Sequence, residues 1–484
     1  MRLEFIGGAS TVTGSCYYLK VNQLRILVDC GMHQGTGFGA DSLNRKPFSF
    51  DPSEVSFMFV THAHMDHSGM LPRLAREGFK GKILTTPATK DLLSPMLFDS
   101  ANIQQNDAEW QTKKALRAGE PPVEPLYTSA DVEMALPLIE AKDYGKLCHL
   151  GSGVKYRFID AGHILGSATL ELWFQDSDRE KKIVFSGDIG KKGNPILNDP
   201  ALPLEADCVV MESTYGNRLH KPLRESVDEL ASAIKTTFKR GGNVYIPTFA
   251  LGRTQDILYI LNGLVRDGRL YDIHVHLDSP LAQETTRIYL AHPECFDEEA
   301  KRLFYSTGAK TAPEKGESIF NSVKGAPSVK LHFVQTVEES MQLNRLKSGH
   351  IIMAGSGMCE GGRIKHHLKH NLWRSECSVV FVGFQARGTL GRRIVNGAKT
   401  VNVLGEEVAV RAQIHTINGF SAHADQNELF EWLRAFSGSP MVFLVHGEDE
   451  AAASLSSLIR EKTGAGGATP IETRRPKDFD VVEL

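Results

Sequence analysis

The 484-residue sequence contains no apolar run approaching the ~18 residues that a membrane-spanning helix needs. Its first residues, 1–8, carry an acid and glycines where a signal peptide has a basic start and a longer apolar stretch, so export is not expected. Its seven cysteines form no C-x-x-C pair, which argues for a reduced, cytoplasmic protein without thiolate zinc ligands. A net charge of −3 excludes a generally basic nucleic-acid coat, although it leaves room for a basic cleft.

The rest of the composition is ordinary except for one residue type. Apolar residues make up 41% and charged residues 23%, which excludes a fully disordered or collagen-like chain. At about 150 residues per domain, the length suggests two or three domains. The eighteen histidines are the unusual feature, and several of them stand close together in the sequence.

Two kinds of secondary-structure pattern divide the chain. Short strands dominate the first part, whereas from about residue 224 predicted helices and strands alternate as in parallel βαβ units. Short strands return after about residue 412, and 464–470 is expected to be a loop. We therefore predict one domain formed by two separated segments, with an α/β domain inserted between them. The predicted segments are 1–214 and 415–484 for the first domain and 215–414 for the insert.

The densest chemical signal is the segment Thr61-His62-Ala63-His64-Met65-Asp66-His67-Ser68-Gly69, directly after the apolar run 55–60. Zinc accepts imidazole nitrogens and carboxylate oxygens at about 2.0–2.2 Å. A turn at a strand end lets His62 and His64 share one metal, while Asp66 and His67 point to a neighbouring position. A chance group of solvated histidines is the alternative, and the spacing after an apolar strand disfavours it.

Four further candidates share one kind of position, the end of a predicted strand, where ligand sites gather on layered sheets. Taken singly, such a histidine is more often structural, and such an aspartate is an ordinary turn residue. The recurrence of the position favours a shared site. The four are His163 after strand 154–160, Asp188 after 183–186, His446 after 441–445, and Asp29 at the end of 24–29.

Three more segments accompany the H-x-H-x-D-H signature: Met211-Glu212-Ser213-Thr214-Tyr215-Gly216, Gly419-Phe420-Ser421-Ala422-His423-Ala424-Asp425 and Val445-His446-Gly447-Glu448. With them the sequence resembles the metallo-β-lactamase superfamily over nearly its whole length. Within that superfamily it resembles the β-CASP nucleases, especially the shorter bacterial and archaeal relatives of the mRNA 3′-end processing endonuclease. The resemblance implies an α/β fold, in which an αββα sandwich carries an inserted α/β β-CASP domain.

The resemblance also implies a ligand set for two zinc ions, with manganese as an alternative metal. His62, His64 and His163 would hold one ion, and Asp66, His67 and His446 would hold the other. Asp188 would bridge the two ions. Asp29 would orient a ligand or the attacking water.

Glu212 and His423 are the candidates for moving a proton to the leaving oxygen, and the resemblance pairs them. A carboxylate beside an imidazole favours the protonated imidazolium, which can act as a general acid at neutral pH. The hypothesis is that His423 is the acid and that Glu212 keeps it charged and oriented. The alternative is that Glu212 only closes a turn.

The insert contains candidates for contacts with nucleic-acid phosphates. Loops 246–253 and 354–358 each join a strand to a helix, where backbone N–H groups attract anions, although a plain tight turn is equally compatible with either loop. Stretch 363–374 has four fixed positive charges, three histidines and no acid, but a solvated charged helix is the usual explanation of such a run. The candidates favoured by the resemblance and by this charge run are Arg253, Ser356, Gly357 and Arg363.

The resemblance points to RNA, because a histidine at position 446 goes with the family's RNA enzymes and the DNA-repair members have an apolar residue there. We expect a cytoplasmic, zinc-dependent endonuclease for single-stranded RNA, with 5′-exonuclease activity left open and a homodimer suggested by family analogy. No membrane partner is expected. The alternatives are a DNA nuclease or small-ester hydrolase using the same metals, and a non-catalytic RNA-binding subunit. The insert disfavours the small-ester reading, and the complete ligand set disfavours the subunit.

Overall fold

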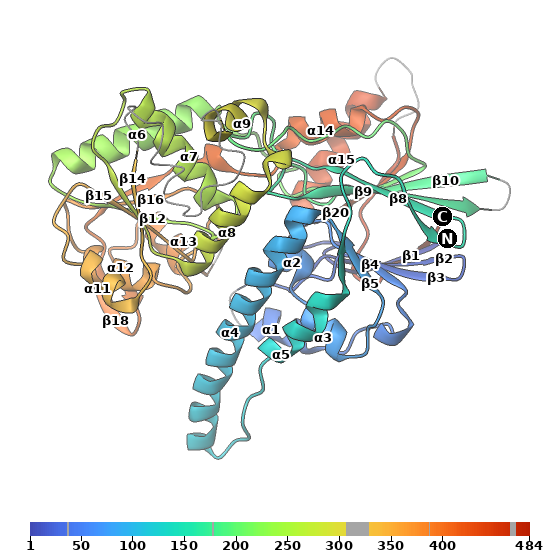
Figure 1. Cartoon of the computed structure of the whole chain (residues 1–484), viewed down its shortest axis with the longest axis horizontal. Coiled ribbons are helices and arrows are strands. Elements are labelled where there is room, and N and C mark those ends of the chain that lie inside the picture. The colour runs from blue at the N-terminus through green and yellow to red at the C-terminus, as the bar shows by residue number, and fades with distance from the viewer. Residues whose placement is uncertain (36–37, 177–178, 306–328, 387, 465–470) are drawn as a thin grey trace. The chain divides into compact units, whose positions relative to one another are not determined.

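The computed structural model describes residues 1–35, 38–176, 179–305, 329–386, 388–464 and 471–484. Two compact units make up the described chain (Figure 1). Unit 1 contains Met1–Asn194, Asn198–Leu219 and His423–Leu484, and unit 2 contains Pro195–Leu197 and His220–Ala422. The domain boundaries expected at 214/215 and 414/415 stay a prediction. The loop expected at 464–470 lies, apart from Gly464, outside the described residues.

The first sheet of unit 1 has seven strands, and the carboxyl ends of its parallel strands lie at the same end of the sheet. Its strands are β1 (Arg2–Gly7), β2 (Cys16–Val21), β3 (Leu24–Val28), β4 (Phe57–Phe59), β5 (Lys82–Thr85), β6 (Ile139–Ala141) and β22 (Val481–Glu483). They follow the order β22-β1-β2-β3-β4-β5-β6. β3, β4, β5 and β6 run parallel, so the residues after β3 and β4 emerge side by side.

The second sheet of unit 1 combines both separated parts of the chain. Its strands are β7 (Cys148–Gly151), β8 (Val154–Asp160), β9 (Ala168–Asp176), β10 (Arg179–Phe185), β11 (Cys208–Glu212), β20 (Met441–Val445) and β21 (Thr473–Arg474). Their order is β21-β20-β11-β10-β9-β8-β7. β10, β11 and β20 run parallel. The strand pairing therefore brings the residues after β20 beside those after β11, more than 230 positions earlier in the chain, and one strand away from those after β10.

Apolar side chains fill the space between the two sheets. Alternate residues face inward, as in β1, where Leu3, Phe5 and Gly7 are buried. Burial of this apolar surface stabilises the sandwich by about 25 cal/mol per Å². The inward-facing residues include Leu19, Ile26 and Phe59 from the first sheet and Phe158, Leu170 and Phe185 from the second.

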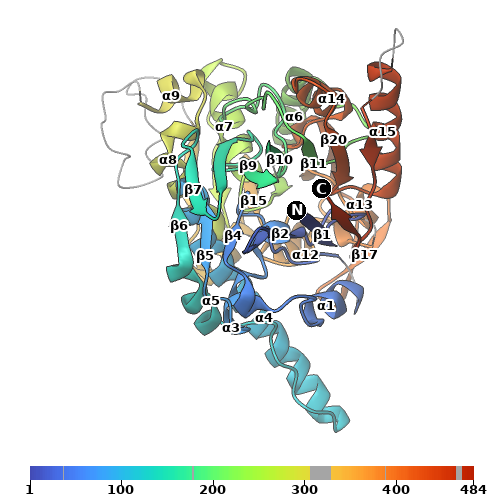
Figure 2. The same cartoon turned by 90° about the vertical axis from the view of Figure 1, so that its right-hand side faces the viewer.

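Helices cover the outer faces of both sheets (Figure 2). These are α1 (Phe38–Arg45), α2 (Met65–Ser68), α3 (Leu71–Arg76), α4 (Pro87–Ala118), α5 (Ser129–Ala135), α14 (Gln426–Arg434) and α15 (Asp449–Thr463). Leu429 and Trp432 of α14 and Leu455 of α15 pack against Val209 and Leu444 of the second sheet. The layers therefore form the predicted αββα sandwich.

Unit 2 is built on a six-stranded parallel sheet. Its strands are β12 (Val244–Pro247), β13 (His274–Leu277), β14 (Lys330–Phe333), β15 (His350–Ala354), β16 (Ser378–Phe381) and β19 (Gln413–Thr416), in the order β14-β13-β15-β12-β16-β19. The neighbours pair in parallel throughout. Separate apolar clusters cover its two faces, with Val244 and Ile246 in one and Tyr245 in the other. This three-layer arrangement confirms the predicted α/β insert.

Helices and a hairpin complete unit 2. The helices are α6 (Leu223–Lys239), α7 (Arg253–Arg266), α8 (Pro280–Ala291), α9 (Glu298–Tyr305), α11 (Val337–Leu343), α12 (Ile364–Asn371) and α13 (Leu390–Val395), and the hairpin joins β17 (Thr400–Val403) to β18 (Glu406–Ala409). Single 3₁₀ turns in the chain are Pro52–Glu54, Leu136–Leu138, Pro293–Cys295 and Asn418–Phe420. In the described part of the chain, no helix is both long enough and apolar enough to cross a membrane.

Two predicted helices differ from the observed ones. Helical periodicity of the sequence around 66–77 predicts one helix, but the structure has two short helices, α2 and α3, separated at Gly69 and Met70. The sequence pattern also predicts a helix over 361–371, which in the structure begins at Ile364, because Gly362 has a φ of +69° and belongs to the preceding turn. Periodicity predicts the existence of these segments better than it predicts their ends.

Candidate metal centre

The candidate ligands of unit 1 emerge from the carboxyl ends of strands in both sheets. Asp29 follows β3, and the 62–67 turn follows β4, which lies parallel beside it. His163 follows β8 in the second sheet. Asp188 and His446 follow β10 and β20, the two parallel neighbours of β11, whose last residue is Glu212. The topology therefore gathers chemically capable side chains at one end of the sandwich.

One group of ligand atoms is formed by His62, His64, His163 and Asp188. Nδ1 of His64 lies 3.2 Å from Nε2 of His62 and 3.3 Å from Nε2 of His163. Oδ2 of Asp188 lies 3.5 Å from both Nε2 atoms. Burial lowers the pKa of His64 to about 4 and holds those of His62 and His163 well below the usual range. These imidazoles are therefore neutral, as metal ligands must be.

A second group is formed by Asp66, His67 and His446, with the other oxygen of Asp188 beside it. The Nε2 atoms of His67 and His446 are 3.3 Å apart, and Oδ2 of Asp66 lies 3.6 Å from Nε2 of His446. Oδ1 of Asp188 is 3.4 Å from Nε2 of His67. Asp188 thus presents one carboxylate oxygen to each group.

Asp188 is buried among imidazoles. Burial acts to raise its pKa, but the histidines at 446, 67 and 62 outweigh burial and hold the pKa of Asp188 well below its usual range. Burial likewise acts to lower the pKa of His67, but the charges of Asp188 and Asp29 raise it well above the usual value. A bound cation would take over the role of the His67 proton, so metal binding here releases a proton.

These donor atoms fit divalent metal ions. Two imidazole nitrogens bound to one tetrahedral zinc at about 2.0–2.1 Å lie roughly 3.3 Å apart, close to the spacings observed here. Within the described chain, no hydrogen bond reaches the buried Oδ1 of Asp188 or Nδ1 of His163. A buried carboxylate oxygen without a hydrogen bond is costly unless a cation satisfies it. The side chains therefore suit two neighbouring cations with Asp188 between them.

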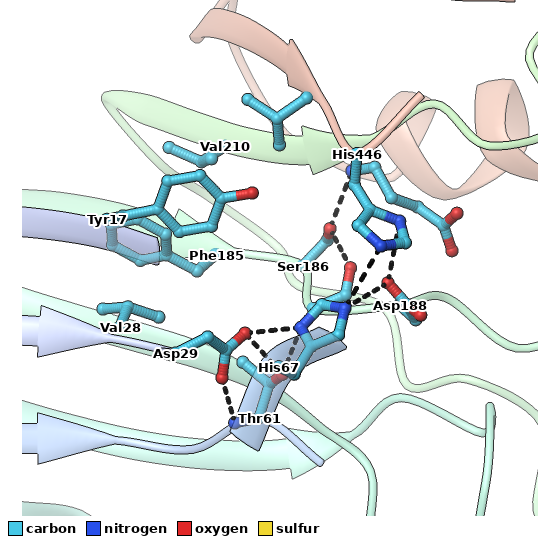
Figure 3. A pocket seen from close by; sticks show the side chains of 13 residues that line it. Tyr17, Val28, Asp29, Thr61, His67, Phe185, Ser186, Asp188, Val210 and His446 are labelled. Atoms are coloured by element: carbon cyan, nitrogen blue, oxygen red, sulfur yellow. Dashed lines mark hydrogen bonds and ion pairs between the residues drawn. The ribbon is translucent and has the colours of Figure 1, made fainter. Parts of the chain in front are cut away.

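Asp29 supports the second group from behind (Figure 3). Its Oδ2 lies 2.7 Å from Nδ1 of His67 and accepts a hydrogen bond of 2.8 Å from the hydroxyl of Thr61. Its Oδ1 accepts from the backbone N–H of Thr61 at 2.8 Å. Figure 3 shows the His67 ring between Asp29 on one side and Asp188 and His446 on the other. The contact between Oδ2 of Asp29 and Nδ1 of His67 fixes the ring so that Nε2 points at the other ligands.

Thr214 fixes the position of His446. Its hydroxyl donates a 2.9 Å hydrogen bond to the carbonyl of His446 and lies 3.1 Å from the Nδ1 atom of that ring. His446 has a φ of +47°, in the left-handed region that is unfavourable for a residue with a side chain. The hydrogen bonds from Thr214 help to hold this backbone conformation and direct the imidazole toward the group.

His423 and Glu212 form a pair next to the first group. Nδ1 of His423 lies 3.1 Å from Oε2 of Glu212 and 3.9 Å from Oδ2 of Asp188. Oε1 of Glu212 accepts a 2.5 Å hydrogen bond from the N–H of Ile189, which orients the carboxylate. Burial acts to lower the pKa of His423, but Glu212 and Asp188 outweigh it and raise the pKa to about 9. The imidazole is therefore protonated at neutral pH.

Comparison with known proteins places this centre in a family. The metallo-β-lactamase superfamily model matches residues 10–145, the Beta-Casp domain model matches 254–394, and the model of the Zn-dependent metallo-hydrolase RNA specificity domain matches 407–474. The protein named Ribonuclease TTHA0252 from Thermus thermophilus is 39% identical over 95% of this chain and 96% of its own length. The chain belongs to the β-CASP ribonuclease family. Membership confirms the resemblance found in the motifs and identifies a metal-dependent hydrolase.

Other β-CASP relatives extend over most of the chain. Transcription termination factor FttA from Methanosarcina mazei is 30% identical over 100% of this chain and 72% of its own. The RNase J-like protein of Methanocaldococcus jannaschii is 30% identical over 94% of this chain and 95% of its own. A crystal structure of an Enterococcus faecalis protein of unknown function shares the fold, with a TM-score of 0.54 at 11% identity, covering 100% of this chain and 99% of that one.

Three of the candidate RNA-contact residues of the β-CASP unit follow the carboxyl ends of two neighbouring strands, β12 and β15. Arg253 begins α7, after β12, and Ser356 and Gly357 follow β15, the neighbour of β12. The two loops touch, because a Cβ on Gly357 would come within 2.8 Å of the Phe249 ring. The Ser356 hydroxyl accepts hydrogen bonds from the N–H groups of residues 360 and 361, so it also closes its own turn.

Acidic residues compensate much of the positive charge of the basic stretch 363–374. Nη1 of Arg363 lies 2.6 Å from Asp278. Arg253, outside the stretch, likewise has Asp256 at 3.5 Å. The remaining pairs in the stretch are Lys369 with Glu406 and Arg374 with Glu376, and His367 is fully buried against Asp278. These contacts favour a structural role for much of the run.

Two groups of residues around these sites were not predicted from the sequence. Thr61 and Thr214 hold Asp29 and His446 in place, and both lie inside motifs that had been noted, so their position was the available signal. Phe249 and Phe384 are 43% and 45% exposed beside the loops of unit 2, which is unusual for phenylalanine. Exposure of a single aromatic residue leaves no pattern in a sequence.

Proposed function

We propose that this protein is a zinc-dependent ribonuclease that hydrolyses phosphodiester bonds of single-stranded RNA with two metal ions. The observation that carries the proposal is the position of Asp188, which presents one oxygen to the imidazole nitrogens of His62 and His163 and the other to the second group. Family membership supports an RNA substrate, because a relative covering almost the whole chain is named a ribonuclease.

In this proposal, three histidines would hold one zinc ion, a mixed group would hold the other, and Asp188 would offer one carboxylate oxygen to each. Manganese is an alternative metal, because nitrogen and oxygen ligands accept both. When bound, such a pair of cations lowers the pKa of water toward neutrality and neutralises charge on the phosphate oxygens. The first set is His62, His64 and His163, and the second is Asp66, His67 and His446.

The chain's own groups orient ligands and supply a proton. Asp29 holds His67 in the tautomer that directs Nε2 toward the metal position. His423, kept in place by Glu212, is the proposed general acid that donates its proton to the leaving oxygen. The carboxylate of Glu212 stabilises the imidazolium before transfer, and the N–H of Ile189 keeps that carboxylate in place.

RNA contacts are proposed for the loops of unit 2. Backbone N–H groups after β15 and at the start of α7 can donate hydrogen bonds to phosphate oxygens, which supports roles for Ser356, Gly357 and Arg253. Arg363 would have to share its guanidinium with Asp278, so its contribution is expected to be the weakest. Exposed Phe249 offers a ring on which a base can stack. Cytoplasmic location, a homodimer and added 5′-exonuclease activity belong to the same proposal.

One assay separates this function from its alternatives. Labelled single-stranded RNA, DNA of the same sequence and a chromogenic lactam are each incubated with metal-loaded protein and with chelator-treated protein. We expect metal-dependent cleavage of RNA only. Cleavage of DNA or lactam at a comparable rate would favour another hydrolase of the superfamily, and binding of RNA without cleavage would favour a non-catalytic subunit. RNA labelled at the 5′ or the 3′ end then distinguishes internal cuts from trimming.

A further inference from the structure

Four histidines outside the metal centre lie on three neighbouring strands of the unit 2 sheet. His274 and His276 are two residues apart on β13, so both point to the same face. His332 on β14 is the register partner of His276, and His350 on β15 is the partner of His274. All four imidazoles therefore project from one face. We refer to them as the sheet histidine cluster.

The rings of the sheet histidine cluster contact one another in a closed circuit. Nδ1 of His274 lies 3.1 Å from Nε2 of His332, and Nε2 of His276 lies 3.0 Å from Nδ1 of His350. Ring centroids of successive members are 4.7 to 5.4 Å apart. A neutral imidazole has one donor and one acceptor nitrogen, so each short contact is a single N–H···N hydrogen bond in the metal-free chain.

These spacings suit chelation of a metal ion. Two nitrogens at about 2.05 Å from one ion lie roughly 2.9 Å apart at a right angle and about 3.3 Å apart in a tetrahedron. The two pairs, at 3.0 and 3.1 Å, fall between these values, and the pairs of the metal centre measure 3.2 to 3.3 Å. In the described chain, however, three mutually close ligand groups occur only at the metal centre. The sheet histidine cluster therefore offers two chelating pairs and needs a ring rotation to add a third ligand.

The charge state of the cluster also suits a cation. Burial, with repulsion from His332, His350 and His274, lowers the pKa of His276 to about 3, although Asp278 acts in the opposite direction. Burial and the neighbouring imidazoles lower the pKa of His350 as well. Neutral imidazole is the form that binds metal. Anion binding, in contrast, would require protonated rings.

We propose that the sheet histidine cluster binds a divalent transition-metal ion, with Zn²⁺ as the test ion. Each half of the ligand set joins two strands, His274 with His332 across β13 and β14, and His276 with His350 across β13 and β15. The bound ion stabilises the edge of the sheet by fixing β14. The site is independent of the proposed RNA cleavage. It binds Zn²⁺ more weakly than the metal centre, because its pairs lack carboxylate ligands.

The first experiment counts bound zinc in three proteins. Wild type, the double variant His276→Asn/His332→Asn, which removes one member of each pair, and the control His415→Asn are dialysed against excess Zn²⁺, and bound zinc is measured per folded chain. His415 lies on β19, the opposite edge strand of the same sheet. We expect the double variant to lose about one zinc relative to both other proteins, while RNA cleavage at saturating zinc stays within about twofold in all three. Equal zinc content in wild type and the double variant would overturn the proposal.

A second measurement keeps the proposal testable if the double variant fails to fold. Crystals of the wild-type protein are grown with Zn²⁺, and anomalous diffraction is recorded on both sides of the zinc absorption edge. We expect an anomalous peak within about 2.2 Å of at least two nitrogens of the sheet histidine cluster. Peaks at Asp188 without a peak at the cluster would show that the four imidazoles are held only by hydrogen bonds.

Discussion

Two histidine clusters of this chain have similar ring spacings but different neighbours. In the metal centre the imidazoles surround Asp188, and the charges of Asp188 and Asp29 raise the pKa of His67 despite burial. In the sheet histidine cluster the imidazoles face one another, and burial with mutual repulsion lowers the pKa of His276 to about 3. The neighbouring carboxylates therefore outweigh burial at His67, whereas burial keeps His62, His64 and His163 of the metal centre neutral, as it does His276.

The strongest way to test this contrast is to remove the shared carboxylate. Asp188→Asn leaves the imidazoles but removes the charge between the two groups. Loss of several kcal/mol of transition-state stabilisation corresponds to an RNA cleavage rate lower by about a thousandfold. Single-turnover cleavage and bound zinc are measured together. Asp228→Asn, at a surface ion pair with Arg269, is the control and should behave like wild type. Unchanged cleavage in Asp188→Asn would remove the distinction between the clusters.

The next largest effect is expected at the proton donor. His423→Ala should lower the RNA cleavage rate by about 10²–10⁴-fold, because a general acid is lost, while bound zinc stays as in wild type. His149→Ala, at an exposed position on β7, is the matched control. Zinc loss in His423→Ala would instead make this residue a ligand and extend the metal centre by one imidazole.

A smaller effect is expected from the carboxylate behind the ligands. Asp29→Asn keeps the size of the side chain but weakens its contact with Nδ1 of His67. Loss of such a supporting hydrogen bond reduces metal affinity or activity by about 10–100-fold. Zinc titration of RNA cleavage should therefore shift to higher zinc concentration, and added zinc should recover much of the activity. A wild-type titration curve would show that Asp29 does not control the centre.

The convergence of the candidate ligands could be predicted from the sequence because each one follows a strand. Residues 62–67 are close in the chain, and His163, Asp188 and His446 have the same local position, so parallel pairing brings them together. Their roles as ligands stay predictions. The sheet histidine cluster could not be found in this way. Its members are separated by up to 76 positions, and only the strand order β14-β13-β15 makes them neighbours.

The charged stretch of unit 2 shows a second limit of sequence patterns. Residues 363–374 contain no acid, yet Asp278 and Glu406 supply counter-charges from other elements. Charge patterns along the chain omit partners that arrive by folding. The start of α12 is a further limit, because Gly362 adopts a positive φ and belongs to the turn before the helix, which begins at Ile364.

The smallest predicted effect concerns a buried acid outside both clusters. Burial raises the pKa of Asp256 to about 6, with only partial compensation by Arg253. The folded state therefore binds more protons than the unfolded state between about pH 4 and 6, and the free energy of unfolding falls as pH rises through this range. Asp256→Asn should reduce that fall by on the order of 2 kcal/mol. Denaturant unfolding at pH 4.5 and 7 measures the free energy of unfolding of each protein. An equal decrease between the two pH values in variant and wild type would contradict the prediction.

The most direct test of the metal centre is stepwise reconstitution. Metal-free protein receives increasing Zn²⁺, and cleavage of labelled single-stranded RNA is measured at each step in wild type and in the His276→Asn/His332→Asn variant. The account predicts no cleavage without metal and full activity near two zinc ions per chain in both proteins. Full RNA cleavage by the metal-free protein, or full activity with one zinc, would contradict a centre in which Asp188 joins two cations.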